Sequence, residues 1–383
     1  MYPKENISLR IRVSLGLQAE YEKDLFYSPY KRISSAPLLY ATPDGVYVFE
    51  GVGRDHLRLY KHDGVYDKTI YPFPVSKIKK VNGLKWTKAP DGHEIPIKES
   101  DYHHTLLTSG TNVGKSVGDT AGDGKPNPID GVAATGLAVK DNRIALAFEY
   151  LNRLAKDGDI GEMSLRGPKT LGTLVHIQNY GGSGGREQMI GPTSMAFSPD
   201  GKILYMTGYM WTYNQKGGSL PAVFKLNYET NEEMSLFAGK KKIEEYGSDD
   251  THFAVPTSVE TDAIGNIYVT DFVNNRVQIF EPSGKLLKSI SVKNPAKVLV
   301  HQKTGEIYIF SWAVVGLPLE LELKVKYEPE KIQQKTYIFT PYPETKIKLE
   351  CEFPLGESNL NFNRVIGQTY QVTLDSWAKT PTI

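Results

Sequence analysis

Short runs in which apolar and polar residues alternate recur along the chain, and turn residues separate them. The clearest unit spans residues 255–290, where a strand led by proline precedes an Ile-Gly-Asn turn at residues 264–266. Further apolar-rich runs follow at residues 267–270, 276–280 and 286–290. Alternation with a period of two is typical of half-buried β-strands. The unit therefore predicts four short antiparallel strands, which is the size of one β-propeller blade.

Partial copies of this unit precede and follow it. They begin at residues 36, 136, 191 and 294, so that five copies are recognisable in all. The Pro-Thr-Ser triplet at residues 256–258 is repeated at residues 192–194, and most copies carry a glycine at the first hairpin turn. The spacing is irregular, which a blade with variable loop insertions explains, because insertions collect in loops while strands stay fixed.

Alternating segments also lie near both ends of the chain. They occur at residues 7–15, at residues 346–349 and at positions 370, 372 and 374. Together they predict a further blade built from both ends, which removes exposed sheet edges. We therefore predict an all-β, six-bladed propeller of four-stranded antiparallel blades as a single domain over residues 1–383, with a long loop insertion over residues 71–131. Seven blades are the alternative, with the extra one between residues 64 and 136.

The segment PTSVETDAIGNIYVTDFVNNRVQIFEPSGKLLKSI, at residues 256–290, closely resembles an NHL repeat. The resemblance extends to residues 191–208 and 294–310, and it is faint in the earlier copies. It implies a six-bladed, NHL-like propeller. It implies little about function, because propellers of this kind include protein-binding, RNA-binding, sugar-processing and amidating-lyase members.

Composition narrows the classes of partner. The 45 basic and 44 acidic side chains give a formal net charge of +1, which supplies no electrostatic attraction for nucleic acid or an anionic membrane. No apolar run is long enough to span a membrane. The one cysteine, Cys351, excludes an internal disulfide and a multi-cysteine metal site. The first ten residues carry no signal-peptide pattern. By analogy with Tyr-rich, loop-elaborated propellers we expect a monomeric, exported protein, with a cytoplasmic one as the alternative.

Two groups of residues are candidates for metal ligands. The resemblance to amidating-lyase propellers implies a channel zinc held by histidines, for which His252 lies just before a predicted inner strand. Asp119, Asp123 and Asp130 lie in a Gly-rich stretch, and their hard oxygens suit calcium. Ordinary blade histidines and a solvated loop are the competing interpretations. The sequence assigns no cofactor with certainty, and calcium and zinc are the candidates.

Aromatic residues offer a candidate ligand surface. Tyr209, Trp211 and Tyr213 crowd a Gly-flanked, loop-like stretch, where their rings can stack on a sugar. Packing between blades is the alternative use of such rings.

The sequence favours a non-catalytic propeller that binds a small molecule, a carbohydrate or a protein on its loop face and central channel. The competing hypothesis is a channel-site enzyme, such as a polysaccharide lyase or hydrolase or a metal-dependent lyase. Its catalytic candidates are His252, His104, Arg143 and Tyr209. Asp271 and Arg276 resemble a catalytic acid and its partner, but we expect them to cap turns and bridge strands.

Overall fold

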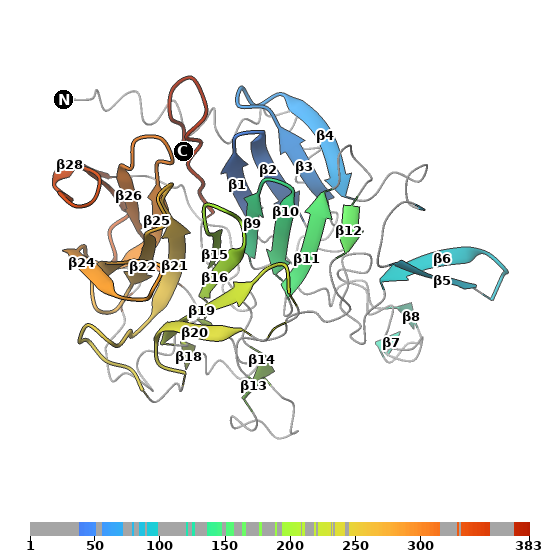
Figure 1. Ribbon diagram of the computed structural model, residues 1–383, viewed down its shortest axis with the longest axis horizontal. Coiled ribbons are helices and arrows are strands. Elements are labelled where there is room, and N and C mark those ends of the chain that lie inside the picture. The colour runs from blue at the N-terminus through green and yellow to red at the C-terminus, as the bar shows by residue number, and fades with distance from the viewer. Residues whose placement is uncertain are drawn as a thin grey trace. The chain divides into compact units, whose positions relative to one another are not determined.

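The structure is a computed structural model of an all-β chain (Figure 1). The chain divides into two compact units, Met1–Leu171 with Val372–Ile383, and Gly172–Gln371. The residues described are 38–50, 56–71, 79, 84–88, 90–98, 120–121, 125–126, 136–147, 151–156, 163–165, 176–177, 188–189, 194–207, 209–210, 218–219, 221–230, 232, 234–241, 245–314, 328, 331–352 and 371–383. No helix among them is both long and apolar enough to cross a membrane.

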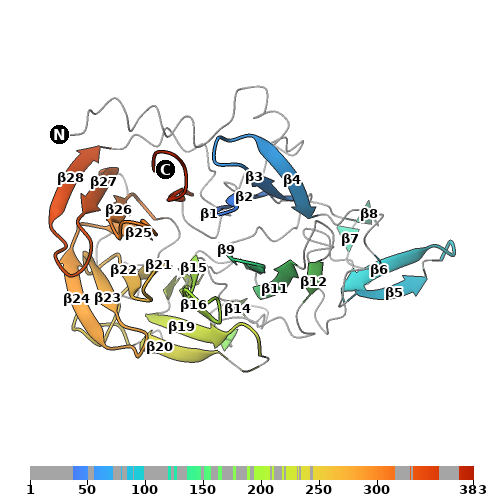
Figure 2. The same cartoon turned by 45° about the horizontal axis from the view of Figure 1, so that its top comes forward.

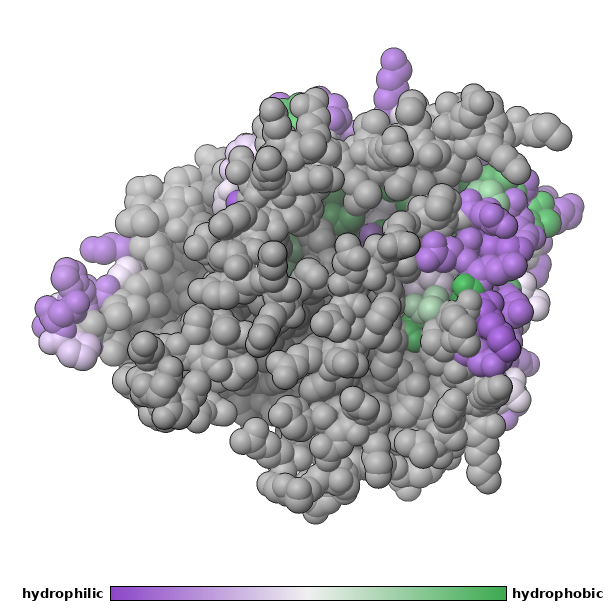
Figure 3. All heavy atoms as spheres, turned by 180° about the vertical axis from the view of Figure 1, so that it is seen from behind, coloured by the Kyte–Doolittle hydropathy of each residue, from purple (hydrophilic) through white to green (hydrophobic). Residues whose placement is uncertain are grey.

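The described part of the first unit contains two four-stranded antiparallel sheets. The first sheet consists of β1 (Leu38–Thr42), β2 (Gly45–Glu50), β3 (His56–Tyr60) and β4 (Tyr66–Tyr71). The second consists of β9 (Gly136–Lys140), β10 (Arg143–Ala147), β11 (Leu151–Lys156) and β12 (Met163–Leu165). The predicted insertion contains two strand pairs, β5 (Leu84–Lys88) with β6 (Glu94–Lys98) and β7 (Thr120–Ala121) with β8 (Lys125–Pro126). The tip of the β5–β6 hairpin is hydrophilic, as the left side of Figure 3 shows.

The described part of the second unit contains three more four-stranded sheets. The third sheet consists of β15 (Ser194–Phe197), β16 (Ile203–Thr207), β19 (Ala222–Asn227) and β20 (Ser235–Gly239). The fourth consists of β21 (Pro256–Thr261), β22 (Ile267–Asp271), β23 (Arg276–Phe280) and β24 (Leu286–Ser291), and the fifth of β25 (Pro295–Val300), β26 (Ile307–Ser311), β27 (Lys335–Phe339) and β28 (Ile347–Glu352). Two short pairs accompany them, β13 (His176–Ile177) with β14 (Gln188–Met189) and β17 (Tyr209–Met210) with β18 (Gly218–Ser219).

The way these sheets meet defines the fold. In each four-stranded sheet the strands pair in chain order, and first strands of neighbouring sheets meet within each unit: β1 contacts β9, and β21 contacts both β15 and β25. Within the second unit, Figure 2 shows β15, β21 and β25 on the inner side and β20, β24 and β28 on the outer side. Sheets arranged in this way are propeller blades. The predicted propeller class is confirmed, and each of the five sequence copies corresponds to one described sheet.

Apolar residues fill the spaces between neighbouring blades of the second unit. Val259 packs with Ala196 and Tyr205 between the third and fourth sheets, and Tyr268 packs with Val298 between the fourth and fifth. Alternation along each strand produces this arrangement, because successive side chains point to opposite neighbours.

The structure tests only part of the predicted blade that would be built from both ends of the chain. The run at residues 7–15 and position 370 lie outside the described residues. Residues 346–349 belong to or adjoin β28, the outer strand of the fifth sheet, so their assignment to a further blade is wrong. The fifth blade needs them because its first three strands end at Phe339. Positions 372 and 374 lie in a segment that is not a strand. A sixth and a seventh blade, and the single-domain organisation, stay predictions.

The C-terminal segment, residues 371–383, returns to the first sheet. The backbone N–H of Ala41 in β1 donates to the Thr373 hydroxyl at 3.0 Å. His62, in the turn after β3, places Nδ1 2.8 Å from the Asp375 carboxylate. The end of the chain is therefore attached to the first sheet by polar contacts and not by a β-ladder.

Candidate functional site

The Pro-Thr-Ser triplets join the inner strands of neighbouring blades. The Ser194 hydroxyl of β15 accepts from the backbone N–H of Val259 in β21 at 3.1 Å and lies 3.4 Å from its carbonyl. The Ser258 hydroxyl of β21 repeats this contact, accepting from the N–H of Val298 in β25 at 3.3 Å. Each serine thus occupies the same place in its copy and serves the same purpose.

The fifth copy departs from this rule at Lys297. Pro295 aligns with Pro256, so Lys297 stands where Ser258 stands in the preceding blade. The side chain is partly buried. Its ammonium makes no hydrogen bond or ion pair within the described chain segments. A long cation has therefore replaced a short bridging hydroxyl on an inner strand.

Glu260 is the second charged residue on the inner strands of this unit. It lies two residues beyond Ser258 and thus on the face of β21 that is turned toward β25. Its side chain is 91% shielded from solvent, with 9% exposed. Its one hydrogen bond to the described residues is from the adjacent backbone N–H of Thr261 to Oε1, at 2.9 Å. Tyr268, its cross-strand neighbour, donates its hydroxyl to Asp262 instead.

Electrostatics link the two residues. Burial raises the pKa of Glu260 to about 7, and the positive charge of Lys297 acts in the opposite direction. Burial likewise lowers the pKa of Lys297, opposed by Glu260. No ion pair within 4.0 Å joins them. Burying charges without close partners is costly, and such groups are concentrated at functional sites. Together they can supply a proton, a hydrogen-bond donor and a positive charge.

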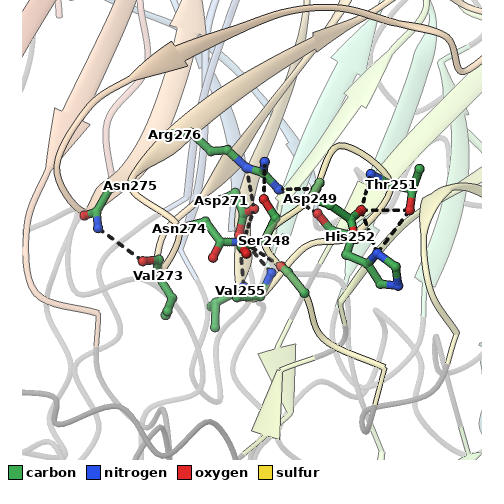
Figure 4. A network of polar contacts seen from close by, with 12 residues as sticks. Ser248, Asp249, Thr251, His252, Val255, Asp271, Val273, Asn274, Asn275 and Arg276 are labelled. Carbon is green, nitrogen blue, oxygen red and sulfur yellow. Dashed lines mark hydrogen bonds and ion pairs between the residues drawn. The ribbon is translucent and has the colours of Figure 1, made fainter.

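A second polar cluster lies around Asp271 at the end of β22, shown in Figure 4. The Asp271 carboxylate is fully buried and accepts from the backbone N–H groups of Ala254 and Val255 at 2.9 and 3.3 Å. It also accepts from Asn274 Nδ2 at 2.7 Å and from Arg276 Nε at 3.0 Å. Burial raises the pKa of Asp271, and the hydrogen bonds from Asn274, Ala254 and Arg276 act against it.

Arg276 uses the rest of its guanidinium to hold a loop. Its terminal nitrogens donate to the carbonyls of Ser248, Asp249 and His252 at 2.7 to 2.8 Å. Every nitrogen of the guanidinium is thus engaged. This arrangement fixes the loop at residues 247–254 on the fourth blade, in the bridging role that the sequence predicts for Asp271 and Arg276.

His252 lies in the same loop and belongs to a local turn. Its Nδ1 is 2.8 Å from Asp249 Oδ1 and 3.0 Å from the Thr251 hydroxyl, and its side chain is 25% exposed. The hydrogen bond to His252 is the largest cause of the lowered pKa of Asp249. No group of three or more potential His, Cys, Asp or Glu metal ligands occurs in the segments that the structure describes.

The other predicted site residues are placed only in part. Arg143 is the first residue of β10 in the first unit, and Tyr209 is the first residue of β17 in the second. His104, Trp211, Tyr213, Asp119, Asp123 and Asp130 lie outside the described residues. The catalytic, ligand-binding and metal roles of all these residues stay predictions.

Sequence reasoning missed Glu260 and Lys297. The signal that finds them is the alignment of the copies, in which Lys297 replaces a serine and Glu260 stands where its neighbours have Ala196 and Leu299. A charge at a position that is otherwise small or apolar indicates a role beyond packing.

Comparisons with known proteins find distant structural likenesses. No protein-family model matches the chain, and no curated protein matches it. Among solved structures, virginiamycin B lyase from Staphylococcus aureus shares 11% identity at a TM-score of 0.39, over 84% of this chain and 86% of that one. The WD40 domain of Toxoplasma gondii coronin shares 13% identity at a TM-score of 0.39, over 85% and 62%.

A third likeness is to hydrazine synthase from Kuenenia stuttgartiensis, with 9% identity and a TM-score of 0.33 over 57% of this chain. The match spans about half, 49%, of that protein's chain. Similarities at this level carry no argument. The fold assignment given above rests on the sheet topology of the chain itself.

Proposed function

We propose that this chain is a ligand-binding β-propeller that recognises a small polar molecule through the inner strands of its second unit and leaves that molecule chemically unchanged. The observation that supports this proposal is the pair Glu260 and Lys297, a buried and a partly buried charged residue on adjacent inner strands without a direct ion pair. The resemblance of residues 255–290 to an NHL repeat supports placing the chain among NHL-like propellers. A bound ligand would supply the hydrogen bonds that the pair lacks.

The surroundings of the pair favour binding over catalysis. Catalysis by a general acid and base needs a second titratable group that is available to the reacting atoms. The hydroxyl of Tyr268 is engaged by Asp262, and the carboxylate of Asp271 is engaged by four donors. The described neighbours of Glu260 therefore offer Lys297 alone as a partner, and its protonated ammonium can only donate, which suits holding a ligand.

An enzyme is the second candidate, and one observation favours it. A carboxyl whose pKa is about 7 is poised to exchange a proton at neutral pH, as a general acid or base must. The two functions differ in what happens to the ligand, because a binding protein returns it intact.

The test is a thermal-shift screen of neutral sugars, sugar acids, amino sugars and short peptides, with the ligand examined afterwards by proton NMR. We expect a compound that raises the melting temperature of the wild type but not that of Lys297→Met. Lys285→Met removes an exposed lysine of the same unit and is expected to behave like the wild type. An equal shift in Lys297→Met would place the binding site elsewhere, and new product signals would show an enzyme.

A further inference from the structure

We infer that the ligand carries a carboxylate, which Lys297 binds as its counter-ion while Glu260, in its protonated form, donates a hydrogen bond to it. This inference rests on the proposed function and names the chemical class of its ligand. It follows from which hydrogen-bonding groups on the inner strands are left without partners, and from the charge that a ligand must have to satisfy them.

The groups at this site that lack partners are hydrogen-bond donors, so a ligand has to supply acceptors. The ammonium of Lys297 has three donors, and none of them is used by the described residues. The carboxyl of Glu260 already receives the N–H of Thr261 at Oε1, so Oε2 is the oxygen available to a ligand. An anion provides acceptors to both groups and neutralises the positive charge. A cationic ligand would instead face Lys297 with its own charge.

The inner strands of the blades also fix where such a ligand would lie. In the two preceding copies, Ser194 and Ser258 accept a backbone N–H from the next inner strand. The ammonium of Lys297 cannot accept a backbone N–H as these serines do, because an ammonium is only a donor. An acceptor for the Lys297 ammonium therefore has to come from outside the strand ladder.

The protonation state of Glu260 decides whether a carboxylate can bind. An ionised Glu260 repels a ligand carboxylate, whereas the protonated form donates to it. Of the groups on strands packed against β21, Lys297 alone acts on this carboxyl. The titratable and charged residues of those strands are Tyr205 on β16, Lys225 on β19, Tyr268 and Asp271 on β22, and Lys297 on β25. Burial, which raises the pKa of Glu260 to about 7, keeps the donor form available near neutral pH.

Two kinds of molecule present this chemistry, a sugar acid and the C-terminal carboxylate of a peptide. Each has a neutral counterpart of nearly the same shape. D-glucuronate is matched by D-glucose, and acetyl-Gly-Gly is matched by its C-terminal amide. Comparing each acid with its counterpart isolates the carboxylate, and comparing the two acids identifies the source.

The experiment is isothermal titration of the full chain with these four compounds at about pH 6 and about pH 8, where both acids stay ionised. We expect one acid to bind at least roughly tenfold more tightly than its neutral counterpart. We expect its affinity to fall up to about tenfold between the two pH values, because a carboxyl with a pKa of about 7 loses most of its proton over this interval.

Substitutions separate the two roles. Glu260→Gln keeps a donor that does not titrate, so we expect it to retain affinity and lose the pH dependence. Lys297→Met is expected to lose about tenfold or more at both pH values, while Lys285→Met is unchanged. Lys297→Gln serves if Lys297→Met does not fold, which circular dichroism shows.

Three results overturn the inference. Equal binding of the acids and their neutral counterparts, with dependence on Lys297 retained, shows a ligand without a carboxylate and leaves the proposed function standing. Weaker binding by Glu260→Gln at both pH values shows that the ionised carboxylate is the active form. The absence of binding by all four compounds, together with a negative screen, removes the proposed function itself.

Discussion

Replacing Arg276 by methionine tests whether the Asp271 cluster is structural. The substitution keeps much of the aliphatic stem and removes the guanidinium that bonds Asp271 and three loop carbonyls. Asp271 is fully buried and the Arg276 side chain is 12% exposed. Removing one partner of a buried ion pair costs about 3–5 kcal/mol, because the other charge stays buried without compensation. We therefore expect the free energy of unfolding to fall by about 3 kcal/mol or more.

The assay is urea unfolding followed by tryptophan fluorescence, with Lys288→Met as the matched control. Lys288 lies on the same sheet, and its ammonium also donates to backbone carbonyls, those of Pro343 and Glu344, but on the exposed surface. Its loss should cost under about 1 kcal/mol. Adding Asp271→Asn to Arg276→Met should restore part of the stability, because it removes the unpaired charge.

One result would refute this reasoning about Arg276. A change below about 1 kcal/mol in Arg276→Met, accompanied by loss of ligand binding or of an activity, would show that the guanidinium serves a ligand and not the loop.

Two further predictions concern Glu260 and Gly239. The pKa of Glu260 rises from 4.5 to about 7 on folding, so the folded state binds the proton more tightly and loses up to about 3 kcal/mol of stability as pH rises through this interval. Glu260→Gln should remove that loss. The prediction is contradicted if the free energies of unfolding of the two proteins change in parallel between about pH 4.5 and pH 8. Gly239→Ala should cost more than about 2 kcal/mol, because φ is +86° and a Cβ would lie 2.2 Å from the Pro221 carbonyl oxygen. Gly92→Ala is the control for the cost of the positive φ alone, because Gly92 has a φ of +89° and no atom within 4 Å of an added Cβ. Equal losses of melting temperature in the two variants would disprove the steric argument.

Much of the fold is readable from the sequence, because the blade is a local unit. The three strands predicted after the first turn, at residues 267–270, 276–280 and 286–290, have ends within one residue of those of β22, β23 and β24. Local alternation and turn residues determine these strands, and the repeated triplet at residues 192–194 and 256–258 marks the inner ones.

Assignment of strands to blades is less predictable when a long connection intervenes. Residues 312–334 separate β26 from β27, so the run at residues 346–349 carries no local sign that it completes the fifth blade. Alternation reveals that a segment is a strand, but not which edge it pairs with.

The residues of the candidate site are likewise predictable from the sequence only where they lie close together in it. Asp271 and Arg276 are close in sequence, and their capping role is predictable from that spacing. Glu260 and Lys297 lie on separate inner strands, and only the contact of β21 with β25 brings them near one another. Their shielding is a property of the packed blades, which no local pattern contains.

Glu260 is a shielded carboxyl on an inner strand, and the charge of Lys297 acts on it. Carbon-13 NMR titration of the Glu260 side-chain carboxyl measures this most directly, with Glu260→Gln used to assign the signal. We predict a pKa of about 7 in the wild type and a higher one in Lys297→Met, because the lysine charge favours the ionised form. A value near the ordinary 4.5 that Lys297→Met leaves unchanged would contradict the claim.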